Sequence, residues 1–130
     1  MPFSTIATPE AKPVANYKMA TRMEGGRLLY ISGQVAWDAA GNIVGKGDVR
    51  AQAKQVFENL RGVLRAAGAT PASVVKETTW VQSIDSWHQH GRAVRRGVYK
   101  TDFPASTLVE IPGLARPEFL VEIEVIAAVA

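Results

Sequence analysis

The chain has 130 residues and a formal net charge of +3, and its 47% hydrophobic and 21% charged residues are ordinary for one globular domain, which we expect over residues 1–130. The absence of cysteine excludes disulfides, thiolate metal sites and a cysteine nucleophile. The first residues lack the apolar stretch of a signal peptide, and no apolar run approaches the ~20 residues of a membrane helix, so we expect a cytoplasmic protein.

The N-terminal third of the chain predicts short strands. Residues 1–15 are rich in proline and small residues, and they predict an extended arm with little structure of its own. Partial alternation of apolar and polar residues predicts strands at 16–23 and 27–37, separated by Glu-Gly-Gly. The turn-rich segment 38–47 has room for a short strand at 43–44.

Residues 48–68 predict the strongest helix of the chain. Apolar residues recur there at helical spacing and form one stripe. Asp48 suits the N-cap, because its carboxylate can accept from the free N–H groups of the first turn. Gly68 suits the position that follows the helix.

The C-terminal half predicts three strands around a second, weaker helix. Residues 85–100 predict this helix, with Asp85 or Ser86 as its cap. The last strand is nearly continuous in apolar residues, as expected for a covered, central strand. The three strands are predicted at 76–84, 106–111 and 119–130.

This order of elements leaves one face of the sheet uncovered. Two helices can cover one face of such a sheet but not both. The other face must meet something apolar, and the simplest candidate is another copy of the same chain.

Two acids stand out in the last strand. Glu122 and Glu124 alternate with Val121 and Ile123, so both carboxylates lie on the same face. A carboxylate partly shielded from water can have a raised pKa and act as a general base. The alternative is that both acids are bonded to neighbouring arginine, threonine or backbone groups.

Other candidate motifs are weaker. Ser32-Gly33-Gln34 ends a strand where glycine permits close approach by a ligand or another strand, although the motif taken alone favours a plain strand-to-turn junction. His88 and His90 do not have the spacing of helical metal ligands, and we expect no metal site. The arginines of GRAVRRGVYK suit either an anionic ligand or a solvated helix face. The sequence contains no phosphate-binding or dinucleotide-binding motif.

Four segments together resemble the RidA (YjgF/YER057c/UK114) family in order and spacing. They read YISGQVAWDAAGNIVG, DVRAQAKQVFENLRGVLRAAGATPASVVKETTWV, FPASTLVEI and LVEIEVIA, and the resemblance runs from about Tyr17 to Ala127. It implies an α+β fold with a mixed, mainly antiparallel six-stranded sheet, two helices on one face and a chorismate-mutase-like homotrimer. It also implies ligand clefts between subunits and hydrolysis of reactive enamines or imines, with no metal or organic cofactor.

The resemblance also assigns site residues. Glu122 matches the family's acid, which positions or activates the attacking water. Leu108 stands where the family often has Ser, Thr or Cys, and its backbone can still bond a ligand. The other positions that match the residues lining the cleft are Tyr17, Ile31, Ser32 and Gly33.

Position 106 departs from the family. Deaminating members carry an arginine after Pro-Ala that clamps the substrate carboxylate, whereas this chain has Ser106 there. A short, neutral serine cannot make the bidentate contact, and its loss weakens carboxylate binding about ten- to a hundredfold. The candidate replacement cations are Arg116, Arg92 and Arg95.

Three functions are compatible with these patterns. The first is a hydrolytic deaminase of an imine or enamine other than 2-aminoacrylate, which releases ammonia and a carbonyl product. The second is a non-catalytic, small-molecule-binding or regulatory trimer, which the missing arginine favours but the retained Glu122 does not. The third is RNA cleavage, attributed to some family members; His88 and His90 permit it, although no RNA-binding motif is present.

Overall fold

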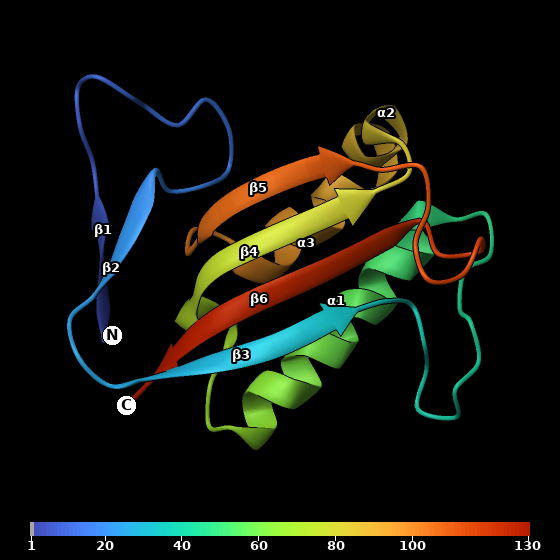
Figure 1. Ribbon diagram of the computed structural model, residues 1–130, viewed down its shortest axis with the longest axis horizontal. Helices are drawn as coiled ribbons and strands as arrows, with labels where there is room; N and C mark the ends of the chain where they lie inside the picture. The colour runs from blue at the N-terminus through green and yellow to red at the C-terminus, as the bar shows by residue number, and fades with distance from the viewer. Residues whose placement is uncertain (1) are drawn as a thin grey trace.

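The computed structural model describes residues 2–130 as a sheet with helices packed on one face (Figure 1). The strands are β1 Phe3–Ile6, β2 Ala20–Met23, β3 Arg27–Gln34, β4 Val74–Val81, β5 Ala105–Glu110 and β6 Val121–Val129. The helical elements are α1 Val49–Ala66, the 3₁₀ turn η1 Pro71–Ser73, and a second helix composed of α2 Ile84–Ser86, the π turn η2 Trp87–Gly91 and α3 Arg92–Tyr99. No helix within residues 2–130 is long and apolar enough to cross a bilayer.

The main sheet has the strand order β3-β6-β4-β5. Strand β6 is antiparallel to both β3 and β4, whereas β4 and β5 are parallel. Both helices lie behind this sheet in Figure 1, and its other face is open toward the viewer. These features confirm the predicted α+β class, with a mixed, mainly antiparallel sheet and two helices on one face.

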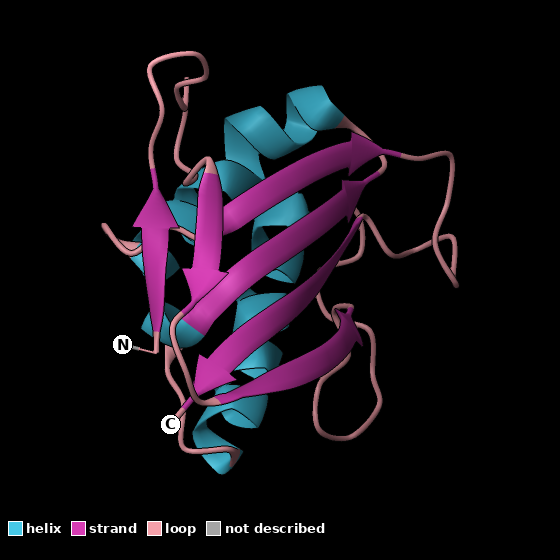
Figure 2. Ribbon diagram, turned by 60° about the vertical axis from the view of Figure 1, so that its left-hand side comes forward, coloured by secondary structure: helices cyan, strands magenta, loops and turns pink. Residues whose placement is uncertain are grey.

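The single six-stranded sheet that the resemblance implied is not formed, because the six strands are divided between a four-stranded and a two-stranded sheet. Strands β1 and β2 pair with each other as a separate antiparallel ribbon beside the main sheet (Figure 2). The prediction of little structure at residues 1–15 is therefore wrong for Phe3–Ile6, because these residues satisfy their backbone groups on β2. The strand expected at 43–44 is reduced to a single bridge between Trp37 and Ile43.

Helix α1 packs its apolar stripe onto the sheet, as predicted. The Asp48 carboxylate caps the helix by accepting from the Ala51 N–H at 3.1 Å. Gly68 follows the helix with a positive φ of 74°, a conformation that glycine adopts without strain. The core between α1 and β6 contains Ala53, Val56, Phe57, Leu60, Leu64, Val121, Ile123 and Val125.

The second helix begins earlier than predicted. Ser83 caps it, rather than Asp85 or Ser86, because the Ser83 hydroxyl accepts from the Ser86 N–H at 3.1 Å. An N-cap oxygen must precede the helix to reach its free N–H groups, and Ser86 is already inside the first turn.

A π turn then interrupts the second helix. The Arg92 N–H donates to the Trp87 carbonyl, five residues earlier, so the turn contains one residue more than an α-helical turn. Gly91 allows this packing, because a Cβ at that position would overlap the indole ring of Trp87. Trp87 is 2% exposed, and the extra residue sets which side chains of α3 face the sheet.

We expect Gly91→Ala to destabilise the fold by about 1–3 kcal/mol, because its Cβ would be forced into the buried indole. Gly97 is the matched control on the same helix, since a Cβ there meets nothing within 4 Å. Alanine at position 97 should stabilise the protein by up to about 1 kcal/mol through helix propensity. Urea unfolding of the two variants measures the difference in stability. Equal effects would contradict the close packing of Gly91 against the Trp87 ring.

Candidate functional site

The strand registers divide the predicted site residues between the two faces of the sheet. Thr79 lies opposite both Leu108 and Ile123, and Ile123 is buried beneath the helices. Because side chains alternate along a strand, Ser106 also faces the helices, whereas Glu122 points to the open face. Within one chain, position 106 and Glu122 therefore cannot contact the same small ligand.

A pocket of about 190 Å³ lies on the helical side, between the second helix, β5 and the segment that precedes β2. Three residues that were predicted to line a ligand cleft meet here, namely Tyr17, Ser106 and Leu108. Arg92 and Arg95 line the same pocket, so two of the three candidate cations are close to position 106.

The other predicted residues lie elsewhere. Ile31 is 5% exposed and belongs to the core, and Ser32 is exposed on the opposite side of β3. Arg116 is exposed, is not among the residues that line the pocket, and has its guanidinium 5.2 Å from the centroid of the Trp37 ring. His88 lines the pocket, and within residues 2–130 no group of three histidine, cysteine or acidic side chains could hold a metal ion.

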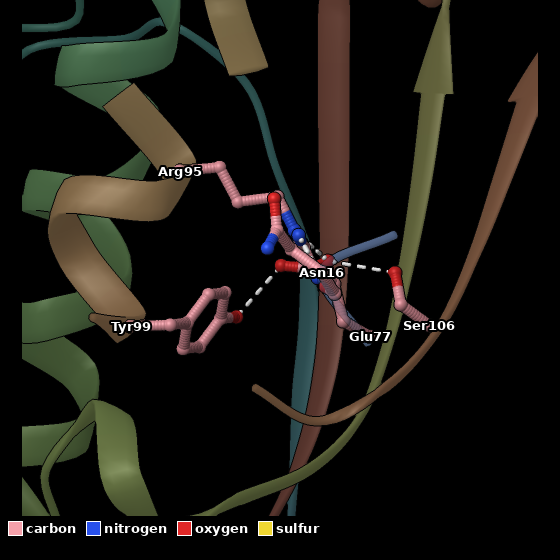
Figure 3. A network of polar contacts seen from close by, with 5 residues as sticks. All are labelled: Asn16, Glu77, Arg95, Tyr99 and Ser106. Atoms are coloured by element: carbon pink, nitrogen blue, oxygen red, sulfur yellow. Dashed lines mark hydrogen bonds and ion pairs between the residues drawn. The ribbon is translucent and has the colours of Figure 1, made fainter. Parts of the chain in front are cut away.

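A buried carboxylate connects the pocket to the helix (Figure 3). Glu77 on β4 is 0% exposed. Its Oε1 accepts from Nε of Arg95 at 2.6 Å and from Oγ of Ser106 at 2.9 Å, while its Oε2 accepts from the Tyr99 hydroxyl at 2.7 Å. The Nη1 of Arg95 donates to the Asn16 carbonyl at 2.8 Å. One carboxylate thus joins β4, β5 and α3.

The surroundings of the Tyr99 hydroxyl keep it protonated. Burial raises the pKa of the Tyr99 hydroxyl well above its ordinary value, and the negative charge of Glu77 raises it further. Tyr99 therefore remains a neutral donor. The guanidinium of Arg95 lies 5.3 Å from the centroid of the Tyr99 ring and 5.5 Å from that of Phe103, so aromatic faces support the cation as well.

Three buried polar atoms of the pocket residues have no hydrogen-bond partner within residues 2–130. They are Nε of Arg92, Nη2 of Arg95 and Oγ1 of Thr79. Thr79 is 2% exposed and Arg95 is 7% exposed. Folded proteins pair the large majority of such atoms, so three of them around one pocket require an explanation.

On the open face, Glu122 packs against Gly33. A Cβ at position 33 would overlap the Glu122 carboxylate, so any other residue there would make this side chain shift from its present position. The pairing of β3 with β6 shifts register between Ile31 and Gln34, which places Gly33 within this irregularity. The group that closely approaches Gly33 is therefore a side chain of the same chain, and the role of Gly33 in lining a ligand cleft stays a prediction.

Burial raises the pKa of the Glu122 carboxyl above its ordinary value, and the neighbouring Glu124 raises it further. The two ion pairs within residues 2–130 are Arg22–Glu24 and Arg95–Glu77, so neither acid of β6 takes part in one. A carboxylate with a raised pKa and no cationic partner is a stronger proton acceptor than an ordinary one.

Sequence reasoning missed Glu77 and Thr79. A signal was present, because Glu77 and Thr79 lie four and two residues before the buried Val81 on β4, so all three side chains share the inward face. An inward-facing acid needs a buried cation or hydrogen-bond donors, which would have directed attention to an arginine of the second helix.

Comparisons with known proteins identify relatives over nearly the whole chain. The family model described as Endoribonuclease L-PSP matches residues 7–129. A RutC family protein from Sulfurisphaera tokodaii is 31% identical, over 95% of this chain and 97% of that protein. A 2-iminobutanoate/2-iminopropanoate deaminase from Dermatophagoides farinae is 30% identical, over 90% of this chain and 92% of that protein. The crystal structure of YyfB, a Rid family protein of unknown function from Yersinia pestis, superposes with a TM-score of 0.89 at 37% identity, over 99% of this chain and all of that one.

The buried pair gives a prediction about stability. Glu77→Gln should destabilise the protein by about 3 kcal/mol or more, because it leaves the buried Arg95 charge without its partner. Glu24→Gln is the matched control, since it removes the carboxylate of the exposed pair with Arg22 and should have little measurable effect. Thermal unfolding of both variants tests the difference, and equal losses would show that Glu77 is not a structural cross-link.

Proposed function

This chain belongs to the Endoribonuclease L-PSP family, and on that premise we propose that it is a hydrolytic deaminase of reactive imines or enamines. The observation that carries the proposal is Glu122, which stands at the position of the family's acid and has the environment of a general base. The Dermatophagoides farinae relative is named for the deamination of 2-iminobutanoate and 2-iminopropanoate, which supports the same reaction class. We also retain the cytoplasmic location as part of the proposal.

The complete site is proposed to form between two copies of the chain. The pocket and Glu122 lie on opposite faces of one sheet, so one ligand can reach both only across an interface. The open face supports such an interface, because Tyr30 is 71% exposed and Leu28 is 42% exposed there. A homotrimer, as expected from the resemblance, would bury these side chains and repeat the cleft at each contact.

The chemistry needs a positioned water and a base. Water adds to the imine carbon while the C=N π electrons take up a proton at nitrogen, and the Glu122 carboxylate accepts the proton that water loses. The amine nitrogen then takes up the proton held by Glu122, and ammonia leaves with the electron pair of the C–N bond as the hydroxyl loses its proton to become the carbonyl. An enamine first takes up a proton at its carbon to become the imine. Because imine hydrolysis is an easy reaction, positioning of water supplies much of the acceleration.

Ser106 affects which substrates the site can be expected to prefer. It lacks the charge that the family's arginine uses to hold a carboxylate, so we propose that 2-aminoacrylate is not the preferred substrate. The same observation supports the alternative function, a small-molecule-binding trimer without turnover. RNA cleavage remains a minor alternative, consistent with the description of the family model.

The reaction can be tested by ammonia release from a panel of imines, corrected for hydrolysis without protein. Wild type should turn over at least one imine, and Glu122→Gln should reduce kcat about a hundredfold or more, as expected for loss of a general base. Ser106→Arg, which restores the family's clamp, shows whether 2-aminoacrylate becomes a substrate. Turnover of no imine by either wild type or Ser106→Arg would replace the deaminase with the binding alternative.

The pH dependence gives a second test. Activity should rise with pH through the raised pKa of Glu122, because only the carboxylate form accepts a proton. Glu124→Gln should retain turnover and move this acidic limb to lower pH, since it removes the like charge that raises the pKa. An unchanged limb in this variant would exclude Glu122 as the titrating base.

The raised pKa of Glu122 also determines whether Glu122→Gln raises or lowers the stability of the fold. A carboxyl whose pKa is higher in the folded state stabilises the fold while protonated, and it loses that contribution as pH rises through the raised value. At neutral pH, Glu122→Gln should therefore fold at least as stably as wild type, so its loss of turnover cannot be attributed to unfolding. Thermal unfolding at pH 7 serves as this control.

A further inference from the structure

We propose that His88, in the π turn of the second helix, gives a proton to the nitrogen of the bound imine and later takes a proton back. The inference rests on the proposed function, because it completes the reaction that Glu122 begins. It assigns a role to a residue that lines the pocket but does not belong to the Glu77 network of Figure 3.

Glu122 alone does not account for every proton of the reaction. Its carboxylate accepts the proton that water loses, and it returns that proton to the amine nitrogen before ammonia leaves. Two further transfers are needed. The imine nitrogen must receive a proton as water adds, and the hydroxyl must lose one as the carbonyl forms. A single group that first gives a proton and later accepts one fills both needs and is restored in each cycle.

The pocket lining contains one side chain that suits this exchange. The guanidinium groups of Arg92 and Arg95 are strong donors that keep their protons, and the phenol that Tyr17 contributes is a weak acid as a class. No carboxylate is among the described residues that line the pocket. Histidine is the side chain that ordinarily changes its charge near neutral pH, so His88 is the natural proton donor of this set.

The π turn presents His88 to the pocket. Trp87, one residue earlier, is 2% exposed and packs in the core, whereas His88 is exposed, so the two side chains leave the helix in different directions. Both residues line the pocket. Neither ion pair within residues 2–130 includes His88, so no carboxylate of its own chain holds the imidazole. The imidazole can therefore face a bound ligand.

His88 and Glu122 reach the ligand from two copies of the chain in the proposed cleft. His88 belongs to the pocket on the helical side, and Glu122 belongs to the open face. The substrate then lies between them. A proton can leave the attacking water on the side of Glu122 while another arrives at the imine nitrogen on the side of His88.

The steps balance with His88 in this role. As the water oxygen bonds to carbon, the C=N π electrons move to nitrogen and take the imidazolium proton, while the Glu122 carboxylate takes a proton from water. The product is a neutral carbinolamine. Glu122 then protonates its amino nitrogen, ammonia leaves with the C–N electron pair, and the neutral imidazole takes the hydroxyl proton. One imine and one water become one carbonyl and one ammonia, and both side chains are restored.

The unpaired polar atoms of the pocket complement His88. Nε of Arg92, Nη2 of Arg95 and Oγ1 of Thr79 can each bond to water in the absence of substrate. The N–H groups of the two arginines can also donate to the oxygen of the carbinolamine, but they cannot transfer their protons to it. These groups orient the intermediate, and the proton transfer at nitrogen is left to His88.

Hydrolysis of three probes tests the role of His88. Benzaldimine and 2-iminobutanoate are N–H imines without and with a carboxylate, and both can be formed during the assay by an amine or amino-acid oxidase. The third probe is the N,N-dimethyl iminium ion of benzaldehyde, whose nitrogen carries a fixed positive charge. Water can add to this ion without proton transfer to nitrogen. The carbonyl product is measured, and rates are corrected for hydrolysis without protein.

The variants compared are His88→Gln and His90→Gln, which removes an exposed imidazole from the same turn at a position that does not line the pocket. His88→Gln should reduce kcat for the N–H imines about a hundredfold, as expected for loss of a general acid, whereas His90→Gln should change it less than about twofold. With the fixed-charge iminium ion, His88→Gln should lose less than about threefold, because the donor is not needed for water addition.

The outcomes separate this inference from the proposed function. Equal losses in His88→Gln for the N–H imines and for the fixed-charge ion would mean that His88 shapes the site without giving a proton, which would overturn the inference. Equal effects of His88→Gln and His90→Gln would also overturn it. Turnover that is lost in Glu122→Gln but kept in His88→Gln would support the deaminase and reject the role of His88. Turnover of no probe by wild type would reject both.

Discussion

The buried carboxylate of Glu77 is the contact on which the pocket depends. An acid enclosed by an apolar core is costly unless donors surround it, and here a guanidinium, a phenol and a serine hydroxyl do so. Because these donors come from α3 and β5, satisfying the charge also fixes the distance between the helix and the edge of the sheet. The geometry of the pocket is therefore a consequence of the requirement that Glu77 be paired.

The alternation of side chains along the strands imposes a second constraint. It places the pocket on the helical face and Glu122 on the open face, and no rearrangement of side chains can change that assignment. A catalytic site that uses both must therefore use two chains. In this fold, assembly would complete the site as well as cover apolar surface, so activity and oligomeric state would depend on the same contacts.

Local patterns were sufficient for much of the fold. Helical periodicity located α1, Asp48 and Gly68 marked its ends, and strict alternation placed Glu122 and Ile123 on opposite faces of β6. The pocket was harder to predict, because Glu77 and Arg95 are eighteen residues apart and meet only through tertiary packing. The N-terminal arm looked unstructured since its partner strand is distant in sequence. The only sequence feature that marks the π turn is Gly91. The need for glycine there is evident only from the structure, where the Trp87 ring packs against it.

The π turn also has a consequence for how the protein could diversify. Each residue of a helix advances the following side chains by roughly 100° about its axis. Deleting one residue between Trp87 and Gly91 would restore a regular helix and rotate Arg92 and Arg95 away from the pocket together. A single-residue insertion or deletion in this segment could therefore exchange the charged lining for another set of side chains while the sheet stayed unchanged. The second helix would thus let evolution alter ligand preference in one step, without replacing the residues of the pocket one by one.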